Sequence, residues 1–125
     1  KFLFIVYFMS KKSEKSADNF KKERKRLNKK ILEIAGKNTK RFFSLDNAVY
    51  REGELPVKTK ELMGLVSSTV LRCDDCIKYH LIQCFENNVS DQELEETLSI
   101  ALIVGGSITI PHIRRAVDFW FELRE

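Results

Sequence analysis

The chain has 125 residues, of which 43% are hydrophobic and 32% are charged. This length suits one domain with one core, and the composition excludes a wholly disordered chain. The five Gly and two Pro are too few for the many turns of an all-β sandwich. No apolar run approaches the roughly 20 residues of a membrane-spanning helix, so we expect no membrane contact.

The positive charge is confined to the N-terminal part of the chain. Residues 11–41 carry thirteen Lys/Arg and four Asp/Glu, whereas residues 42–125 carry eight and fourteen. Such a basic segment is most often a solvated face, and contact between the oppositely charged regions of two subunits is a second explanation. A non-enzymatic role in binding nucleic acid is less favoured, because no base-reading motif accompanies the segment.

The first residues are expected to lie outside the folded domain. Residues 1–8 are apolar and precede Met9, but they are too short for a signal peptide and no small-residue cleavage site follows them. We expect Met9 to be the natural start, with residues 1–10 disordered or derived from an expression vector or upstream translation. Residues 11–125 are then a single domain.

Hydrophobic periodicity predicts three helices before the cysteines. Over residues 11–36, four apolar residues recur in one narrow stripe: Phe20, Leu27, Ile31 and Ile34. A stripe this narrow indicates a helix on the surface of the body or on another subunit. Residues 39–51 form the second predicted helix, and Pro56 opens a third that runs to about Leu71.

Three more helices are predicted after residue 72. The first starts near Cys73 and ends near residues 87–88, and Ser90 and Glu93 form a capping box for the next. Pro111 opens the last helix, whose three consecutive aromatic residues, 119–121, indicate core and oligomer contacts. The predicted fold is therefore all-α, a compact bundle of about five to six helices with a basic N-terminal helix.

The three cysteines indicate the compartment. An odd number with one close pair is unlike a secreted disulfide framework. We expect a cytoplasmic protein with a reactive or metal-binding Cys pair.

The segment from residue 73 to residue 80 has the spacing of a reactive thiol site. Cys73, Cys76 and His80 are three and four residues apart, so a helix places them on one face. A helix N-terminus favours the thiolate, which is the nucleophilic form. Asp74 and Asp75 oppose ionisation of the thiol if they lie close, so we expect His80 to serve as an explicit base.

Glu61 is expected to join this site. If the chain reverses near residues 70–71, Glu61 precedes the turn by about as much as His80 follows it. Two antiparallel helices would then place Glu61 beside His80, with Cys76 one turn nearer the bend. A carboxylate beside an imidazole fixes its tautomer and supports its role as a proton acceptor.

The pattern Glu61, Cys73-x-x-Cys76 and His80 resembles that of alkylhydroperoxidase D-like proteins of the carboxymuconolactone decarboxylase superfamily. The resemblance covers roughly residues 39–123 and implies an all-helical homo-oligomer, a trimer or hexamer. It implies that Cys76 attacks a peroxide, assisted by a relay through His80 and Glu61, and that Cys73 resolves the intermediate into a disulfide. The sequence departs from the best-known member at Asp75, where that member has a second His.

The leading hypothesis is a thiol-dependent oxidoreductase that reduces hydroperoxides or partner disulfides. No nucleotide or flavin motif is present, so we expect no cofactor, and an external thiol system would supply the electrons. A zinc module using Cys73, Cys76, His80 and Cys84 is an alternative, although ligands from one short helix suit a tetrahedral site poorly. A lactone decarboxylase is another, but members with that activity lack the C-x-x-C pair. Outside these alternatives, we expect Cys84 to be a core residue and His112 to be structural or part of a pocket wall.

Overall fold

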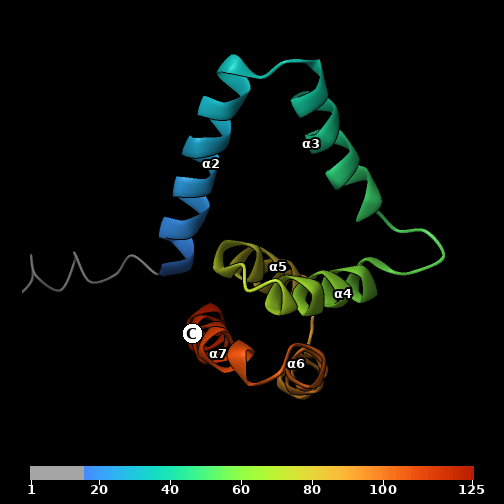
Figure 1. Cartoon of the computed structure of the whole chain (residues 1–125), viewed down its shortest axis with the longest axis vertical. Helices are drawn as coiled ribbons and strands as arrows, with labels where there is room; N and C mark the ends of the chain where they lie inside the picture. Colours follow the sequence, from blue (N-terminus) through green and yellow to red (C-terminus); the bar gives the residue numbers. More distant parts are fainter. Residues whose placement is uncertain (1–15) are drawn as a thin grey trace, which may run out of the picture.

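The computed structural model describes residues 16–125, and all regular secondary structure in this part of the chain is helical, with no strand (Figure 1). The helices are α2 (Ser16–Ile34), α3 (Lys37–Val49), α4 (Val57–Val70), α5 (Asp74–Glu86), α6 (Asp91–Gly105) and α7 (Ile110–Leu123), with a short 3₁₀ turn, η1 (Ser107–Thr109). The all-α prediction is confirmed. Residues 1–10, which were expected to lie outside the domain, are not among the described residues. The first turn of the helix predicted over residues 11–36 also lies outside them.

Local sequence signals fix where the helices of the body begin and end. Pro56 is the N-cap of α4, and the predicted capping box of Ser90 and Glu93 opens α6. Arg72 and Asn88 end α4 and α5 in the left-handed region, with φ of 59° and 61°. Each left-handed residue turns the chain within a few positions, so that α5 packs back on α4 after Arg72 and α6 packs on α4 after Asn88.

Helices α4 to α7 form the body of the molecule. α4 packs against α5 and α6, and α7 packs against α5 (Figure 1). Their apolar faces enclose a core whose fully buried side chains include Leu65, Ile77, Leu81 and Cys84. Because α4 and α5 are joined by only three residues, their facing side chains meet at predictable heights along the pair.

Helices α2 and α3 form an arm that rises from the body (Figure 1). Only the first turns of α2 touch the core: Ala17 is buried, and the ring of Phe20 meets that of Phe119 edge-on at 6.2 Å. α3 has no buried residue. The arm therefore exposes a set of large apolar side chains: Leu27, Ile31, Leu32, Ile34, Phe42, Leu45 and Val49.

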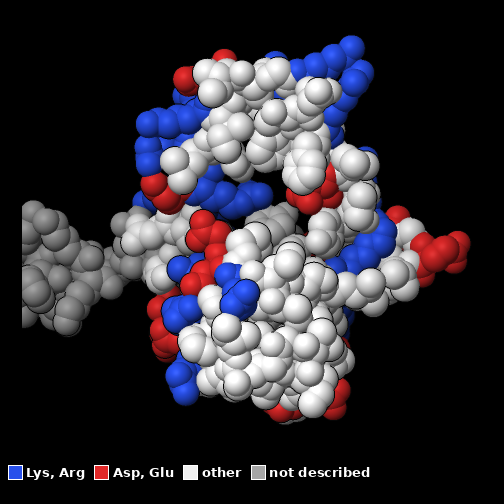
Figure 2. All heavy atoms as spheres, viewed as in Figure 1, with Lys and Arg blue, Asp and Glu red and all other residues white. Residues whose placement is uncertain are grey.

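The basic helix was expected to lie on the surface of the body or on another subunit. Its first turns contact the body, and its later apolar residues are exposed. Figure 2 shows basic side chains gathered along this arm. Within residues 16–125, no helix is both long and apolar enough to cross a membrane.

The aromatic residues of α7 divide between core and surface. Phe119 and Trp120 are 3% and 2% exposed, whereas Phe121 is 46% exposed. The Trp120 indole N–H donates a hydrogen bond to Asp91 at 2.7 Å, which ties α7 to the start of α6. As the sequence indicated, the three side chains do not all point inward.

Candidate active site

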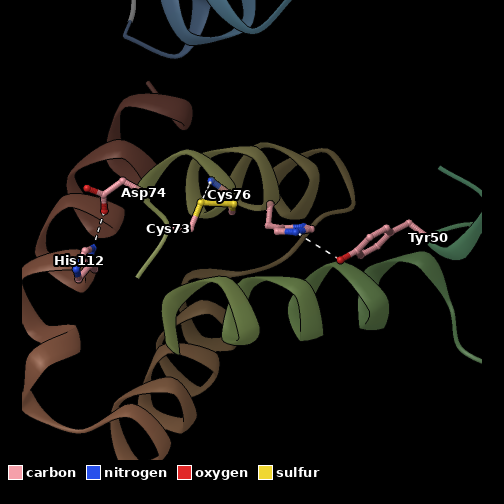
Figure 3. The surroundings of a disulfide bond; sticks show 6 residues. Tyr50, Cys73, Asp74, Cys76 and His112 are labelled. Atoms are coloured by element: carbon pink, nitrogen blue, oxygen red, sulfur yellow. Dashed lines mark hydrogen bonds and ion pairs between the residues drawn. A yellow bond between two sulfur atoms is a disulfide. The ribbon is translucent and has the colours of Figure 1, made fainter. Parts of the chain in front are cut away.

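The two cysteines of the C-x-x-C pair meet at the start of α5. Their sulfurs are joined in a disulfide, with the Cα atoms 5.3 Å apart (Figure 3). Cys73 is the N-cap, and its Sγ accepts a hydrogen bond from the backbone N–H of Cys76 at 3.2 Å. Cys76 is exposed and Cys73 is partly buried. The pair can therefore exchange between disulfide and dithiol within one helical turn, and Cys76 is the more exposed residue of the two.

A buried carboxylate–imidazole pair lies beside the disulfide. Nδ1 of His80 on α5 is 2.7 Å from Oε2 of Glu61 on α4, and these residues are 7% and 3% exposed. A carboxylate accepts, so in the neutral imidazole this contact favours the tautomer with the proton on Nδ1 and a lone pair on Nε2. The structure thus brings Glu61 and His80 together as the spacing about the turn predicted, and their catalytic role stays a prediction.

Glycine at position 64 makes room for this imidazole. A Cβ there would lie 2.5 Å from Cε1 of His80 and 2.8 Å from both ring nitrogens. Only hydrogen at that position lets the ring approach the backbone of α4 this closely. The close approach of α4 and α5 at the site therefore depends on Gly64, which no sequence motif had indicated.

Tyr50 is a second site residue that sequence reasoning missed. It is the C-cap of α3, and its hydroxyl lies 3.5 Å from Nε2 of His80 (Figure 3). Burial, followed by the negative charge of Glu61, raises the pKa of the Tyr50 phenol above its usual value, so it remains protonated at neutral pH. The sequence predicted a helix over residues 39–51 but gave no signal that its end reaches the site.

The two aspartates between the cysteines have different surroundings. Asp74 turns away from the sulfurs and accepts hydrogen bonds from Nδ1 of His112 at 2.8 Å and Nε of Arg115 at 3.1 Å (Figure 3). Burial opposes ionisation of Asp74, but these hydrogen bonds outweigh it and lower its pKa. Asp75 is exposed. Asp74 should therefore disfavour the thiolate less than the sequence suggested, because its carboxylate is paired with two side chains of α7.

A cleft of about 670 Å³ opens onto the disulfide and the imidazole. Cys76 and His80 lie on its α5 side, and α2 supplies much of the opposite wall, including Phe20, Leu27 and Ile31. Arg24 of α2 lies over the ring of Tyr79 at 4.3 Å and closes one margin of the cleft. The basic helix thus contributes to the surroundings of the cysteine pair.

The third cysteine is separate from this chemistry. Cys84 is fully buried in the core, and burial, assisted by the charge of Glu61, raises its thiol pKa to about 12. No three His, Cys, Asp or Glu side chains within residues 16–125 are placed to hold a metal ion. The alternative zinc site at Cys73, Cys76, His80 and Cys84 is therefore not formed, since the first two sulfurs bond to each other.

Fold and site together define a class of small helical protein with a C-x-x-C disulfide at a helix start and a buried Glu–His pair beside it. The family model of the carboxymuconolactone decarboxylase family matches residues 37–119. The chain belongs to this family. Among the described helices, α2 alone lies wholly outside the matched range, and α7 extends beyond its end.

Solved structures agree with this assignment. The chain is 64% identical to the crystal structure of TM1620 from Thermotoga maritima, with a TM-score of 0.83, over 85% of this chain and 93% of that one. A second structure of that protein, at 63% identity and a TM-score of 0.82, covers 85% and 90% and describes a carboxymuconolactone decarboxylase family protein with a suggested role in the antioxidative response.

More distant relatives share the same fold or sequence pattern. The apo structure of lpg0406, a carboxymuconolactone decarboxylase family protein from Legionella pneumophila, is 25% identical with a TM-score of 0.79 and covers 87% of this chain and 97% of that one. A protein of uncharacterised function from Cupriavidus necator is 27% identical over 82 residues, which is 66% of this chain and 73% of that protein.

Proposed function

We propose that this protein is a thiol-dependent oxidoreductase that reduces hydroperoxides, with the Cys73–Cys76 disulfide as the oxidised state of its cycle. The observation that carries the proposal is the buried 2.7 Å contact between Glu61 and His80 next to that disulfide. Burying a carboxylate and an imidazole costs free energy unless the two groups are paired. Their pairing beside a nucleophile is the arrangement of a proton relay. The suggested antioxidative role of the Thermotoga maritima protein supports the same chemistry.

The cycle begins with the dithiol form. His80 takes the proton of the Cys76 thiol, and the thiolate attacks one peroxide oxygen, so that the O–O bond breaks and an alcohol leaves with that proton. Cys76 is then a sulfenic acid. The Cys73 thiol attacks its sulfur, water leaves, and the disulfide forms. One hydroperoxide is reduced to alcohol and water while two thiols are oxidised.

An external dithiol returns the enzyme to its starting state. Its thiolate attacks the Cys73–Cys76 bond, and the mixed disulfide is resolved by the second thiol of the donor. A partner disulfide could enter by the reverse of this exchange, so reduction of a disulfide substrate uses the same two sulfurs. No step requires a cofactor. We propose a cytoplasmic location, where thiol donors of this kind are abundant.

We propose further that other copies of the chain cover the apolar face of the arm, in a trimer or hexamer. Seven large apolar side chains of α2 and α3 are at least 43% exposed, which is more than a stable monomer usually leaves on one extended element. Light scattering coupled to size exclusion should give a mass of three or six chains, and a mass of one chain at micromolar concentration would contradict this.

The function is tested with the pre-reduced protein. Stoichiometric hydroperoxide should remove two of the three thiols, and dithiothreitol should restore them. Turnover of cumene hydroperoxide with dithiothreitol should vanish in Cys76→Ser and persist in Cys84→Ala, the matched control in the core. Unchanged turnover in Cys76→Ser, or no thiol loss with peroxide or with a small disulfide, overturns the proposal.

A further inference from the structure

One nitrogen of His80 remains available once Glu61 has taken the other. Nδ1 donates to Glu61, so any proton that His80 accepts must go to Nε2. Cys76 lies four residues before His80 on α5, on the same face of the helix, and both line the same cleft. The direction and protonation of Nε2 therefore decide whether the imidazole can serve the thiol.

In the disulfide form, Nε2 faces Tyr50. The hydroxyl lies 3.5 Å away, and the two ring centroids are 5.2 Å apart. A protonated phenol donates to a nitrogen lone pair, and this is the tautomer that the contact with Glu61 already demands. Glu61 on α4 and Tyr50 after α3 thus act on opposite nitrogens of one ring and favour the same protonation state.

A single lysine holds the chain that carries Tyr50. Nζ of Lys60 donates to the backbone carbonyl of Val49 at 2.8 Å and to that of Arg51 at 2.7 Å, the residues on either side of Tyr50. Lys60 directly precedes Glu61 on α4. Because no residue of α3 is buried, these two hydrogen bonds of Lys60 help to fix the end of α3 to the body.

We propose that Tyr50 is a positioning residue for His80 and that Lys60 acts through it. The Tyr50 hydroxyl donates to Nε2 and so favours the tautomer in which that nitrogen keeps its lone pair while the cysteines are oxidised. Since one lone pair serves one donor, the Cys76 thiol replaces the phenol when the disulfide is reduced and then finds a nitrogen ready to accept its proton. The expected effect on turnover rests on the proposed function, whereas the contacts of Tyr50 and Lys60 do not depend on it.

The test uses the disulfide form and nitrogen NMR. The chain has two histidines, so His80 and His112 give separate ¹⁵N signals, with His112 as an internal reference. In Tyr50→Phe, which keeps the ring and removes the hydroxyl, the Nε2 signal of His80 should move downfield because an unprotonated nitrogen loses its donor. The signals of His112 should stay in place. An unmoved Nε2 signal of His80 overturns the proposal, whatever the activity of the protein.

Lys60→Met tests the second half of the inference. It should move the His80 signal in the same direction as Tyr50→Phe, and the double variant should move it no further, because Lys60 acts through Tyr50. Lys58→Met is the matched control: it removes an ammonium that pairs with Glu93 at 2.9 Å, and His80 should be unaffected. A shift in the double variant equal to the sum of two separate shifts would overturn the role of Lys60.

Turnover supplies the functional readout. Loss of one hydrogen bond that orients the base should lower kcat about tenfold in Tyr50→Phe and leave KM for the hydroperoxide unchanged. Lys58→Met should keep the full kcat. If Cys76→Ser abolishes turnover while Tyr50→Phe retains the full kcat, Tyr50 does not position the base, and the proposed function still stands.

Discussion

The α-carbon of Gly64 faces the imidazole of His80 with no side chain between them, and a Cβ at this position would lie 2.5 Å from Cε1. Alanine normally stabilises a helix interior relative to glycine by roughly 0.5–1 kcal/mol. Here we expect the opposite sign, because a methyl group must displace a buried ring whose Nδ1 is held by Glu61. Gly64→Ala should lower the free energy of unfolding by about 1–3 kcal/mol, measured by urea denaturation.

The control for this prediction is Gly36→Ala. Gly36 is the N-cap of α3, its φ is −79°, and a Cβ there would meet nothing within 4 Å. The free energy of unfolding should change less in Gly36→Ala than in Gly64→Ala, and the kcat of Gly36→Ala should equal that of wild type. A Gly64→Ala variant as stable and as active as wild type would show that the ring has another place to go.

The carboxylate of Glu61 should matter more for rate than for structure. Glu61→Gln keeps the size of the side chain but removes the charge that stabilises an imidazolium formed when His80 accepts a proton. We expect kcat for hydroperoxide reduction to fall by roughly 10²-fold. Glu96→Gln, an exposed glutamate on α6, should keep the wild-type rate. Equal rates for the two variants would remove Glu61 from the relay.

Much of the site could be predicted from the sequence because its parts are close along two adjacent helices. The i, i+3 and i+4 spacings fixed Cys73, Cys76 and His80 on one face of α5. The short turn between α4 and α5 then set Glu61 opposite His80, since only three residues separate these helices. Local geometry and one reversal of the chain were enough.

The contacts that the sequence did not predict depend on packing that no local pattern encodes. His112 and Arg115 on α7 reach Asp74 only because α7 packs against α5, and Tyr50 reaches His80 from the end of an arm with no buried residue in α3. For this reason Asp74, which was expected to disfavour the thiolate, is paired with side chains of α7. The arm itself was predicted as helix, but no sequence pattern gave its position relative to the body.

Cys84 should behave as an inert thiol in the folded protein. With a pKa of about 12, its thiolate fraction at pH 8 is about 10⁻⁴, and it is fully buried as well. Oxidised native protein should therefore show no thiol that reacts with iodoacetamide at pH 8, and denatured oxidised protein should show one. Rapid labelling of the native oxidised protein would mean that the core opens on the timescale of the assay.

The ion pairs of Asp74 should contribute to stability in a pH-dependent way. Its pKa is lowered in the folded state, so the contribution is complete well above the unfolded value of about 3.9 and is lost as pH falls through the folded value. Asp74→Asn should thus be less stable than wild type at pH 6 and equally stable near pH 2. Because the side chain is 41% exposed, solvent screening limits the difference to about 0.5 kcal/mol. Urea denaturation at both pH values measures it, with Asp118→Asn, an exposed aspartate on α7, as the control. A difference for Asp74→Asn that is the same at pH 2 and pH 6 would mean that its cause is packing rather than charge.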